Sequence, residues 1–385
     1  IGFAGDAPHK AAWSLSLWNG FLIFNIASWG LYLRGRKFAL FGVLISAFSP
    51  FLFSLRTDYV LELPLISAIT FYLFHLGRWS DHSSGGKWIQ LMVASFACAI
   101  CLLIKQSSLL VIIPSFLFVF IISFKRDNKF RLQLVCFSIV NILVILPWFY
   151  HNWIMILSGT YRAVFVSASI EGDPSIFDFK SIFWYFPYLD NQFGKIIFFV
   201  GLSGIVFIFL NYIKYFKTPL RLENPLNNSN YKWTWIYFNL FASWTFTTFI
   251  PNKDERYIAG TVPLIILVLA LGFCKWSDWF DSYFKFKFYC LLFFAPLSFL
   301  FSNSLNKFTA LENYQSKYYP VKEMISIIKS DKTSDEKETV IVIPSTPEVN
   351  QHNVSYIGRM QGGNILGRQL GQSLSHIEPV LEYSN

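Results

Sequence analysis

The sequence has little charge and lacks the compact motifs of many soluble enzymes. Only 14% of its 385 residues are Asp, Glu, Lys or Arg, whereas an ordinary soluble chain has about 25%. It has no glycine-rich nucleotide loop, no helix with paired histidines and no cluster of Cys and His. All five cysteines fall in apolar runs, which excludes a disulfide framework and a metal spacing and leaves them as small hydrophobic side chains.

Apolar and aromatic residues dominate instead. The chain is 54% hydrophobic and contains 43 Phe and 13 Trp. Runs long enough to cross a bilayer, about 17–25 residues each, lie at 11–33, 38–55, 59–77, 88–104, 107–124, 132–150, 195–213, 233–250, 256–274 and 287–303. We therefore predict an all-α polytopic membrane domain over residues 1–303, with about ten transmembrane helices and no internal repeat.

The basic residues lie in alternate connections between these runs. Five connections, at 34–37, 78–87, 125–131, 214–232 and 275–287, carry a summed charge of +11, and the connections between them are near neutral. This is the positive-inside pattern, so the five are predicted to face the cytoplasm. The net charge of +9 consequently does not indicate a nucleic-acid partner.

Two further segments are predicted to lie on the outer side. Residues 151–195 are rich in aromatics between turn residues, which favours a segment in the membrane interface. Residues 304–385 have ordinary soluble polarity, with a helical pattern at 321–330 and a buried strand at 339–344. They predict a small C-terminal extracytoplasmic α/β domain.

Two carboxylates open the third apolar run. Asp58 and Glu62 stand four residues apart, a spacing that places them on one face of a helix. A charge at bilayer depth costs about 2.5–3.5 kcal/mol on insertion scales, so the pair indicates a functional site. The alternative is that both merely complement the dipole at a helix start.

Basic residues end or begin other apolar runs on the same predicted side. Lys105 follows seventeen mostly apolar residues, and Lys253, Arg256 and Tyr257 lie at the start of another run. Converging Lys and Arg side chains suit a phosphate group. The alternative for Lys105 is a lysine that extends from a helix end to the interface.

An aromatic stretch, Pro147–Trp153, ends with candidate sugar contacts. His151 and Asn152 within it could reach a sugar, although an interfacial anchor explains most of the stretch.

Together, four stretches resemble the membrane-embedded GT-C glycosyltransferases, specifically the dolichyl-phosphate-mannose-protein mannosyltransferase-like superfamily that includes the lipid A aminoarabinose transferase. The stretches are Ser54–Leu65, Leu103–Ser107, Pro147–Asn152 and Asn252–Pro263. They are similar, in order, to an acidic segment before Pro-Leu, to Leu-Thr-Lys, to Pro-Trp-Tyr-x-x-Asn and to Asn-Lys-Asp-x-Arg-Tyr followed by Pro. Glu62 takes the place of the acid, and Lys105 is in register with the family's lysine.

The resemblance implies a function. The donor would be a polyprenyl-phosphate sugar whose phosphate meets Lys105, Lys253 or Arg256. An acceptor hydroxyl of a lipid, glycan or protein would attack the anomeric carbon with inversion. No feature of the sequence requires a metal or a cofactor. The expected location is a bacterial inner membrane, with the active site and the C-terminal domain on the periplasmic side.

The family's catalytic acid lies in its first outer loop, where this chain departs from the pattern. Residues 1–10 are similar to the tail of that loop, but Asp6 does not match the acidic motif. We expect that the chain begins inside a longer protein and that the principal base precedes Ile1. Glu62 and Asp58 would then have supporting roles.

Two rival functions share the lipid-linked substrate. A transporter or flippase would be expected to have inverted repeats and helices broken near the midplane, whereas the charges here gather at helix ends. An O-antigen ligase or polymerase would be expected to have several arginines in a large outer loop, whereas residues 151–195 contain only Arg162.

Overall fold

The computed structural model describes residues 8–57, 60–81, 87–166, 168, 173–215, 228–284, 293–302, 321–331, 338–342, 349–360 and 364–368. The candidate site residue Asp58 and the nonmatching Asp6 lie outside the described residues. The chain divides into two compact units, Ala7–Leu305 and Asn306–Asn385.

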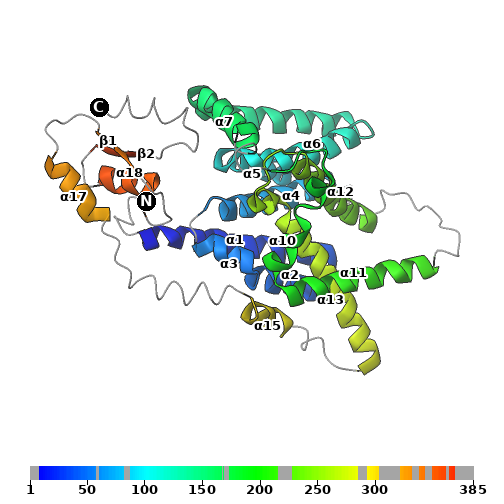
Figure 1. Ribbon diagram of the computed structural model, residues 1–385. Coiled ribbons are helices and arrows are strands. Elements are labelled where there is room, and N and C mark those ends of the chain that lie inside the picture. Colours follow the sequence, from blue (N-terminus) through cyan, green and yellow to red (C-terminus); the bar gives the residue numbers. More distant parts are fainter. Residues whose placement is uncertain are drawn as a thin grey trace. The chain divides into compact units, whose positions relative to one another are not determined.

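The first unit is helical (Figure 1). Its longer helices are α1 (Pro8–Arg34), α2 (Arg36–Ala47), α3 (Pro50–Thr57), α4 (Glu62–Ser80), α5 (Trp88–Ile104), α6 (Leu109–Ser123), α7 (Asn128–Tyr161), α11 (Lys195–Tyr215), α12 (Asn228–Thr248) and α13 (Val262–Phe284). Short helical segments fill the connections: η2 (Gln106–Ser108), η3 (Arg162–Val166), α9 (Phe179–Phe183), α10 (Phe186–Phe193), η4 (Glu255–Thr261) and α15 (Phe294–Leu300).

Helices pack side by side both with their neighbours in sequence and with distant helices. α4 packs between α1 and α5, and α5 also packs against α7, as Figure 1 shows. α13 packs against α2 and α11, and α12 against α6. Polar side chains between the helices form hydrogen bonds. Trp79 Nε1 donates to Gln133 Oε1 at 2.9 Å, and Trp235 Nε1 donates to the Leu73 carbonyl at 3.1 Å. These bonds satisfy groups that an apolar interior would otherwise leave unpaired.

Glycines allow α11 and α13 to approach closely. A Cβ placed on Gly204 would lie 2.2 Å from the Gly272 carbonyl oxygen, and one on Gly272 would lie 1.9 Å from the Gly201 carbonyl oxygen. Small residues at helix crossings are typical of membrane bundles, because they let the two backbones approach closely and gain van der Waals contact.

The structure corrects two predicted segment boundaries and adds a sharp bend before a third segment. The run 38–55 is not one helix: α2 and α3 meet at a bend of 54°, because Pro50 begins α3 and cannot continue the hydrogen bonds of α2. α7 continues to Tyr161 instead of ending at Tyr150, so the first part of the 151–195 segment is helical. Gly194, with a φ of +82°, joins α10 to α11 at a bend of 116°. The 88–104 run is confirmed as α5.

Fewer helices than predicted meet a strict test for crossing a membrane. By length and composition, three described helical stretches qualify, namely Gln106–Ser123, Asn128–Tyr161 and Glu255–Ser282, or up to five if each bent pair is one span. α5 is an apolar helix of only 17 residues. The chain is thus a helical polytopic membrane protein, and the count of ten stays a prediction.

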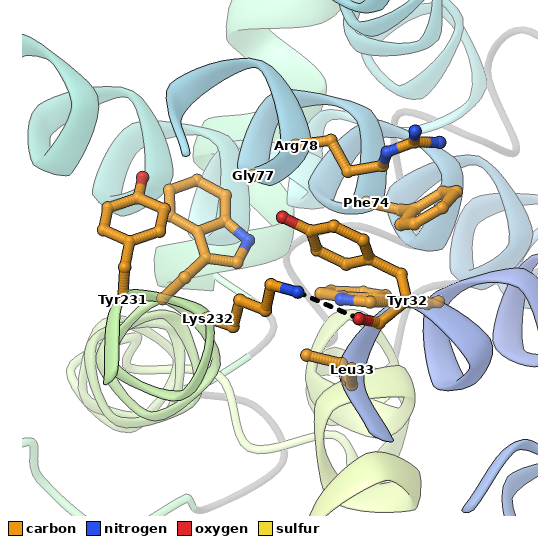
Figure 2. Close-up of a pocket in the computed structure, with 9 residues that line it drawn as sticks. Tyr32, Leu33, Phe74, Gly77, Arg78, Tyr231 and Lys232 are labelled. Atoms are coloured by element: carbon orange, nitrogen blue, oxygen red, sulfur yellow. Dashed lines mark hydrogen bonds between the residues drawn. The ribbon is translucent and has the colours of Figure 1, made fainter. Parts of the chain in front are cut away.

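The five basic connections meet at one end of the bundle. Contacts join the ends of α1, α4 and α13 and the starts of α2, α7 and α12 there. They are Arg34–Asp278 at 3.2 Å, Lys37–Asp278 at 2.9 Å, Arg126 to the Ser80 carbonyl at 2.9 Å and Lys232 to the Tyr32 carbonyl at 3.1 Å. Figure 2 shows the last of these contacts. Which side of the membrane this end faces stays a prediction.

The described part of the second unit contains two helices and two strands: α17 (Val321–Asp331), β1 (Glu338–Ile341), α18 (Gln351–Met360) and β2 (Ile365–Arg368). The strands pair in parallel, with Glu338 opposite Ile365, and α18 lies between them in sequence as a crossover. A small core contains Val321, Ile325 and Val354. β1 is half-buried, whereas the sequence predicts a fully buried strand at 339–344.

Candidate active site

Glu62 is the first residue of α4. Glu62 is buried. The N-cap of α4 is Leu61, and no side chain forms a capping hydrogen bond there. Val60 and Leu61 are not helical, and α3 ends at Thr57. The helix thus begins only at the second carboxylate, and because Asp58 lies outside the described residues, the expectation that the two share one helical face stays a prediction.

Lys105 ends α5 and pairs with Glu62. Lys105 has an extended backbone, with φ −160° and ψ 134°, between α5 and η2. Its Nζ lies 2.5 Å from Glu62 Oε1, and the two side chains are 29% and 3% exposed. A buried carboxylate is tolerated when it is paired and hydrogen-bonded. The ammonium that ends one helix thus compensates the carboxylate that begins another.

Arg256 is held beside this pair by its own loop. The Asp254 carboxylate caps η4 by accepting the Arg256 backbone N–H at 2.8 Å, and it accepts Arg256 Nε at 2.8 and 3.1 Å. Burial alone would raise the pKa of Asp254, but the hydrogen bonds and charge of Arg256 outweigh it and lower the pKa. Half of the Arg256 side chain is exposed, so its guanidinium can meet a ligand.

The three segments interact at one place. Arg256 interacts electrostatically with Glu62, and Asp254 with Lys105. Lys105 Nζ lies 5.9 Å from the centre of the Tyr257 ring, within the range of a cation–π contact. The start of α4, the end of α5 and the start of η4 therefore form one charged cluster, which we call the Glu62 cluster: Glu62, Lys105, Asp254, Arg256 and Tyr257.

Lys253 occupies a different position from the one expected. Lys253 is only 4% exposed, and its ammonium donates to the Thr248 carbonyl at the end of α12. Burial lowers the pKa of Lys253 to about 8, although the Asp173 carboxylate opposes the shift. Lys253 thus caps a helix end and does not present its ammonium beside Lys105.

Asp173 is not among the site residues predicted from the sequence. Its carboxylate accepts the Lys253 backbone N–H at 2.7 Å, and its own N–H donates to the Ala168 carbonyl at 3.1 Å. It joins the segment after α7 to the loop that carries Arg256. Its position in Gly172-Asp173-Pro174 indicated only a turn, so no local signal pointed to this partner.

The other candidates keep to their own helix. Asn152 donates to the Trp148 carbonyl at 2.9 Å, and the His151 ring lies edge-on to Tyr150, all within α7. Their contact with a sugar stays a prediction. Among the described residues, no group of three or more His, Cys, Asp or Glu side chains could hold a metal ion.

The geometry suits an anionic ligand that competes with carboxylates. Lys105 contacts Glu62, and Arg256 contacts Asp254, so each cation already has one anionic partner. A phosphate group could replace these partners, because Arg offers a planar fork to phosphoryl oxygens and Lys a compact charge.

The chain has the GT-C fold, as its similarity to solved structures shows. The fold is similar to that of ArnT, an aminoarabinose transferase. A crystal structure of ArnT from Cupriavidus metallidurans bound to undecaprenyl phosphate has a TM-score of 0.57 and 12% identity, and covers 97% of this chain and 74% of that one. The apo structure has the same TM-score and identity, with 94% and 72% covered. No protein-family model matches the sequence, and neither does any curated protein.

Proposed function

We propose that the chain is an integral membrane glycosyltransferase that moves a sugar from a polyprenyl-phosphate donor to an acceptor hydroxyl. The observation that carries the proposal is the Glu62 cluster, where Lys105 and Arg256 meet a buried carboxylate at the end of an apolar bundle. The fold is similar to that of a protein whose structure contains undecaprenyl phosphate. An apolar bundle with a basic mouth matches the two parts of such a donor.

The donor phosphate is proposed to take the place of Glu62 at Lys105 and to bind the exposed side of Arg256. Lys105 Nζ is within hydrogen-bond distance of Glu62, and a phosphate oxygen would compete for the same ammonium. Arg256 can keep Asp254 and still use its exposed side, since a guanidinium has five N–H donors. The exchange would release Glu62 toward the acceptor only when donor is bound.

The reaction is a single displacement. The acceptor oxygen forms a bond to the anomeric carbon and gives its proton to a carboxylate, while the bond from the anomeric carbon to the phosphate oxygen breaks. The electron pair stays on the phosphate, whose growing charge Lys105 and Arg256 stabilise. One displacement inverts the anomeric configuration. General-base assistance of this kind contributes about 10²–10⁴-fold, and we assign Glu62 to positioning the acceptor.

The structure changes the proposed role of Lys253. Its ammonium is committed to Thr248, so we assign it to supporting the loop. Tyr257 is proposed to hold Lys105 in place through its ring. From the charge distribution, the site is proposed to open on the periplasmic side of a bacterial inner membrane. The acceptor is a lipid, glycan or protein hydroxyl.

Turnover of a labelled donor tests the proposal. The purified protein, given undecaprenyl-phosphate sugars and a mixture of envelope lipids and glycans, should release undecaprenyl phosphate only when acceptor is present. Glu62→Gln should lower kcat by at least tenfold without weakening donor binding, because it removes a group that acts on the acceptor and that competes with the donor phosphate for Lys105. A wild-type rate for this variant would contradict the role of Glu62.

The rivals predict other outcomes. Transbilayer movement of an intact lipid-linked sugar without release of polyprenyl phosphate would identify a transporter or flippase. Release of a polyprenyl diphosphate carrier from an oligosaccharide donor would identify a ligase or polymerase.

A further inference from the structure

Residues 173–193, between α7 and α11, expose an apolar face. Phe177, Phe179, Phe183 and Phe186 are 46–86% exposed, and we call these four residues the phenylalanine face. The rings of Phe179 and Phe183 are 4.8 Å apart, and those of Phe183 and Phe186 are 5.7 Å apart. A contiguous exposed apolar surface of this kind marks contact with a membrane or with another molecule.

The direction of the segment suits the surface of a bilayer. Phe179–Phe193 meets Lys195–Leu210 at a bend of 116°, which is 26° from a right angle. α11 has 21 residues, or about 31 Å at 1.5 Å per residue, so it can cross a hydrocarbon core of about 30 Å without the preceding segment. With α11 along the membrane normal, α9 and α10 therefore run close to the membrane plane.

The phenylalanine face continues the exposed apolar surface of α12. The Phe186 ring lies 5.1 Å from that of Trp244 in α12, and Phe241, about one turn before Trp244, is exposed. In a polytopic membrane protein the exposed apolar side of such a helix contacts lipid. Helices that lie in the interface likewise bury their apolar side at the boundary of the acyl chains. Continuity with α12 therefore indicates phospholipid chains as the partner of the phenylalanine face.

Polar groups of the same segment hold the loop that carries Arg256. The Asp173 carboxylate accepts the Lys253 N–H at 2.7 Å. Ser181 is buried, and its Oγ lies 3.5 Å from the Thr248 carbonyl oxygen, which also accepts the Lys253 ammonium. Lys253 stands three residues before Arg256. The position of the segment thus affects the position of Arg256 in the Glu62 cluster.

We propose that residues 173–193 lie in the membrane interface on the side of the Glu62 cluster, with the phenylalanine face among phospholipid acyl chains, and that they thereby fix the Arg256 loop at the depth of the donor phosphate. The second half of this statement rests on the proposed function. An interfacial position explains why the exposed side of the segment is apolar while the polar groups of Asp173 and Ser181 turn to the protein. It also makes donor binding depend on the attachment of the segment to the bilayer.

Photocrosslinking tests the membrane position. The full chain with Phe183→p-benzoylphenylalanine, in nanodiscs of dioleoylphosphatidylcholine, should gain the mass of one phospholipid on illumination, because the benzophenone inserts into a nearby C–H bond. The same replacement at Phe241 of α12 is the positive control. The negative control is Ser326, which is exposed in α17 of the second unit. A crosslink to a second copy of the chain, a lipid adduct at Phe241 without one at Phe183, or equal yields at Phe183 and Ser326 would overturn the proposal.

Donor binding tests the link to the Glu62 cluster. Phe179→Ala with Phe183→Ala should weaken the binding of undecaprenyl phosphate in the same nanodiscs about fivefold, which is equivalent to about 1 kcal/mol. The matched control is Phe199→Ala with Phe209→Ala, which removes two exposed phenylalanines from α11 and should leave binding unchanged. The two double variants should have the same unfolding midpoint.

Asp173→Ala breaks the link without changing the phenylalanine face. It should weaken the binding of undecaprenyl phosphate and keep the lipid adduct at Phe183. Wild-type affinity in this variant or in the Phe179 and Phe183 double variant would contradict the link. A wild type that does not bind undecaprenyl phosphate would contradict the proposed function instead, and the adduct at Phe183 would then support the membrane position alone.

Discussion

Lys105 and Glu62 are each acceptable in the bundle because of the other. Glu62 has almost no exposed surface, and its described partner is the Lys105 ammonium at 2.5 Å. Removing one member of such a pair leaves a buried charge without compensation, which is far more destabilising than removing both. The pair therefore serves stability as well as the proposed function.

We predict that Lys105→Met lowers the free energy of unfolding by about 3 kcal/mol. The double variant Glu62→Gln with Lys105→Met should recover most of this loss, because no charge is then left buried. Thermal unfolding in detergent at pH 7 measures both. Equal destabilisation by the single and the double variant would contradict the pairing.

The lowered pKa of Lys253 predicts that the stability of the protein depends on pH. Burial lowers its pKa to about 8 from an ordinary 10.5. Between these values the unfolded chain binds more protons than the folded chain, so the Lys253 contribution to stability rises with pH from about 8 to about 10 and is unfavourable below 8.

The matched comparison is with Lys253→Met, which cannot titrate. The stability of the wild type minus that of the variant should increase as the pH rises from 8 to 10. Unfolding midpoints at several pH values measure this difference. A constant or falling difference would mean that the folded protein does not depress the pKa of Lys253.

At the scale of elements, the crossing of α11 and α13 depends on glycine. Gly204→Ala should place a methyl group 2.2 Å from the Gly272 carbonyl oxygen, and such overpacking costs about 1–3 kcal/mol. The control is Gly20→Ala in α1, where a Cβ would meet nothing within 4 Å. The control should be neutral or slightly stabilising, because alanine favours a helix. An unfolding midpoint of Gly204→Ala equal to that of the control would refute the close crossing.

The sequence predicted some elements well and others poorly, for physical reasons. α5 follows the apolar run 88–104, because an uninterrupted apolar stretch leaves helix as the favourable choice in lipid. The break between α2 and α3 at Pro50 and the bend at Gly194 depend on local backbone chemistry that hydrophobicity does not register.

The candidate site divides in the same way. The sequence placed Lys105, Glu62 and Arg256 at helix ends on one side, and the structure brings them together, while their roles stay proposals. It could not foresee that Lys253 turns to Thr248 or that Asp173 holds its loop. Both contacts depend on how α12 and the segment after α7 pack, which no short stretch of sequence specifies.

At the scale of the whole molecule, α4 connects two charged ends of an apolar bundle. The Glu62 cluster lies at its start and Arg78, which contacts the Tyr32 ring, near its end. Charge at the ends and apolar surface between them are what a bilayer requires of a spanning unit. The similarity in fold to ArnT extends over 97% of the chain.

The central claim is that Lys105 and Arg256 bind the phosphate of a polyprenyl-phosphate lipid. Binding of undecaprenyl phosphate to the purified protein, measured by native mass spectrometry, tests it most directly. Arg256→Gln and Lys105→Gln should each weaken binding at least tenfold, because a hydrogen bond to a charged group is worth about 1.5–3 kcal/mol. Lys180→Gln, which removes an exposed charge from α9, should not. Binding that is unchanged in the first two variants would contradict the account.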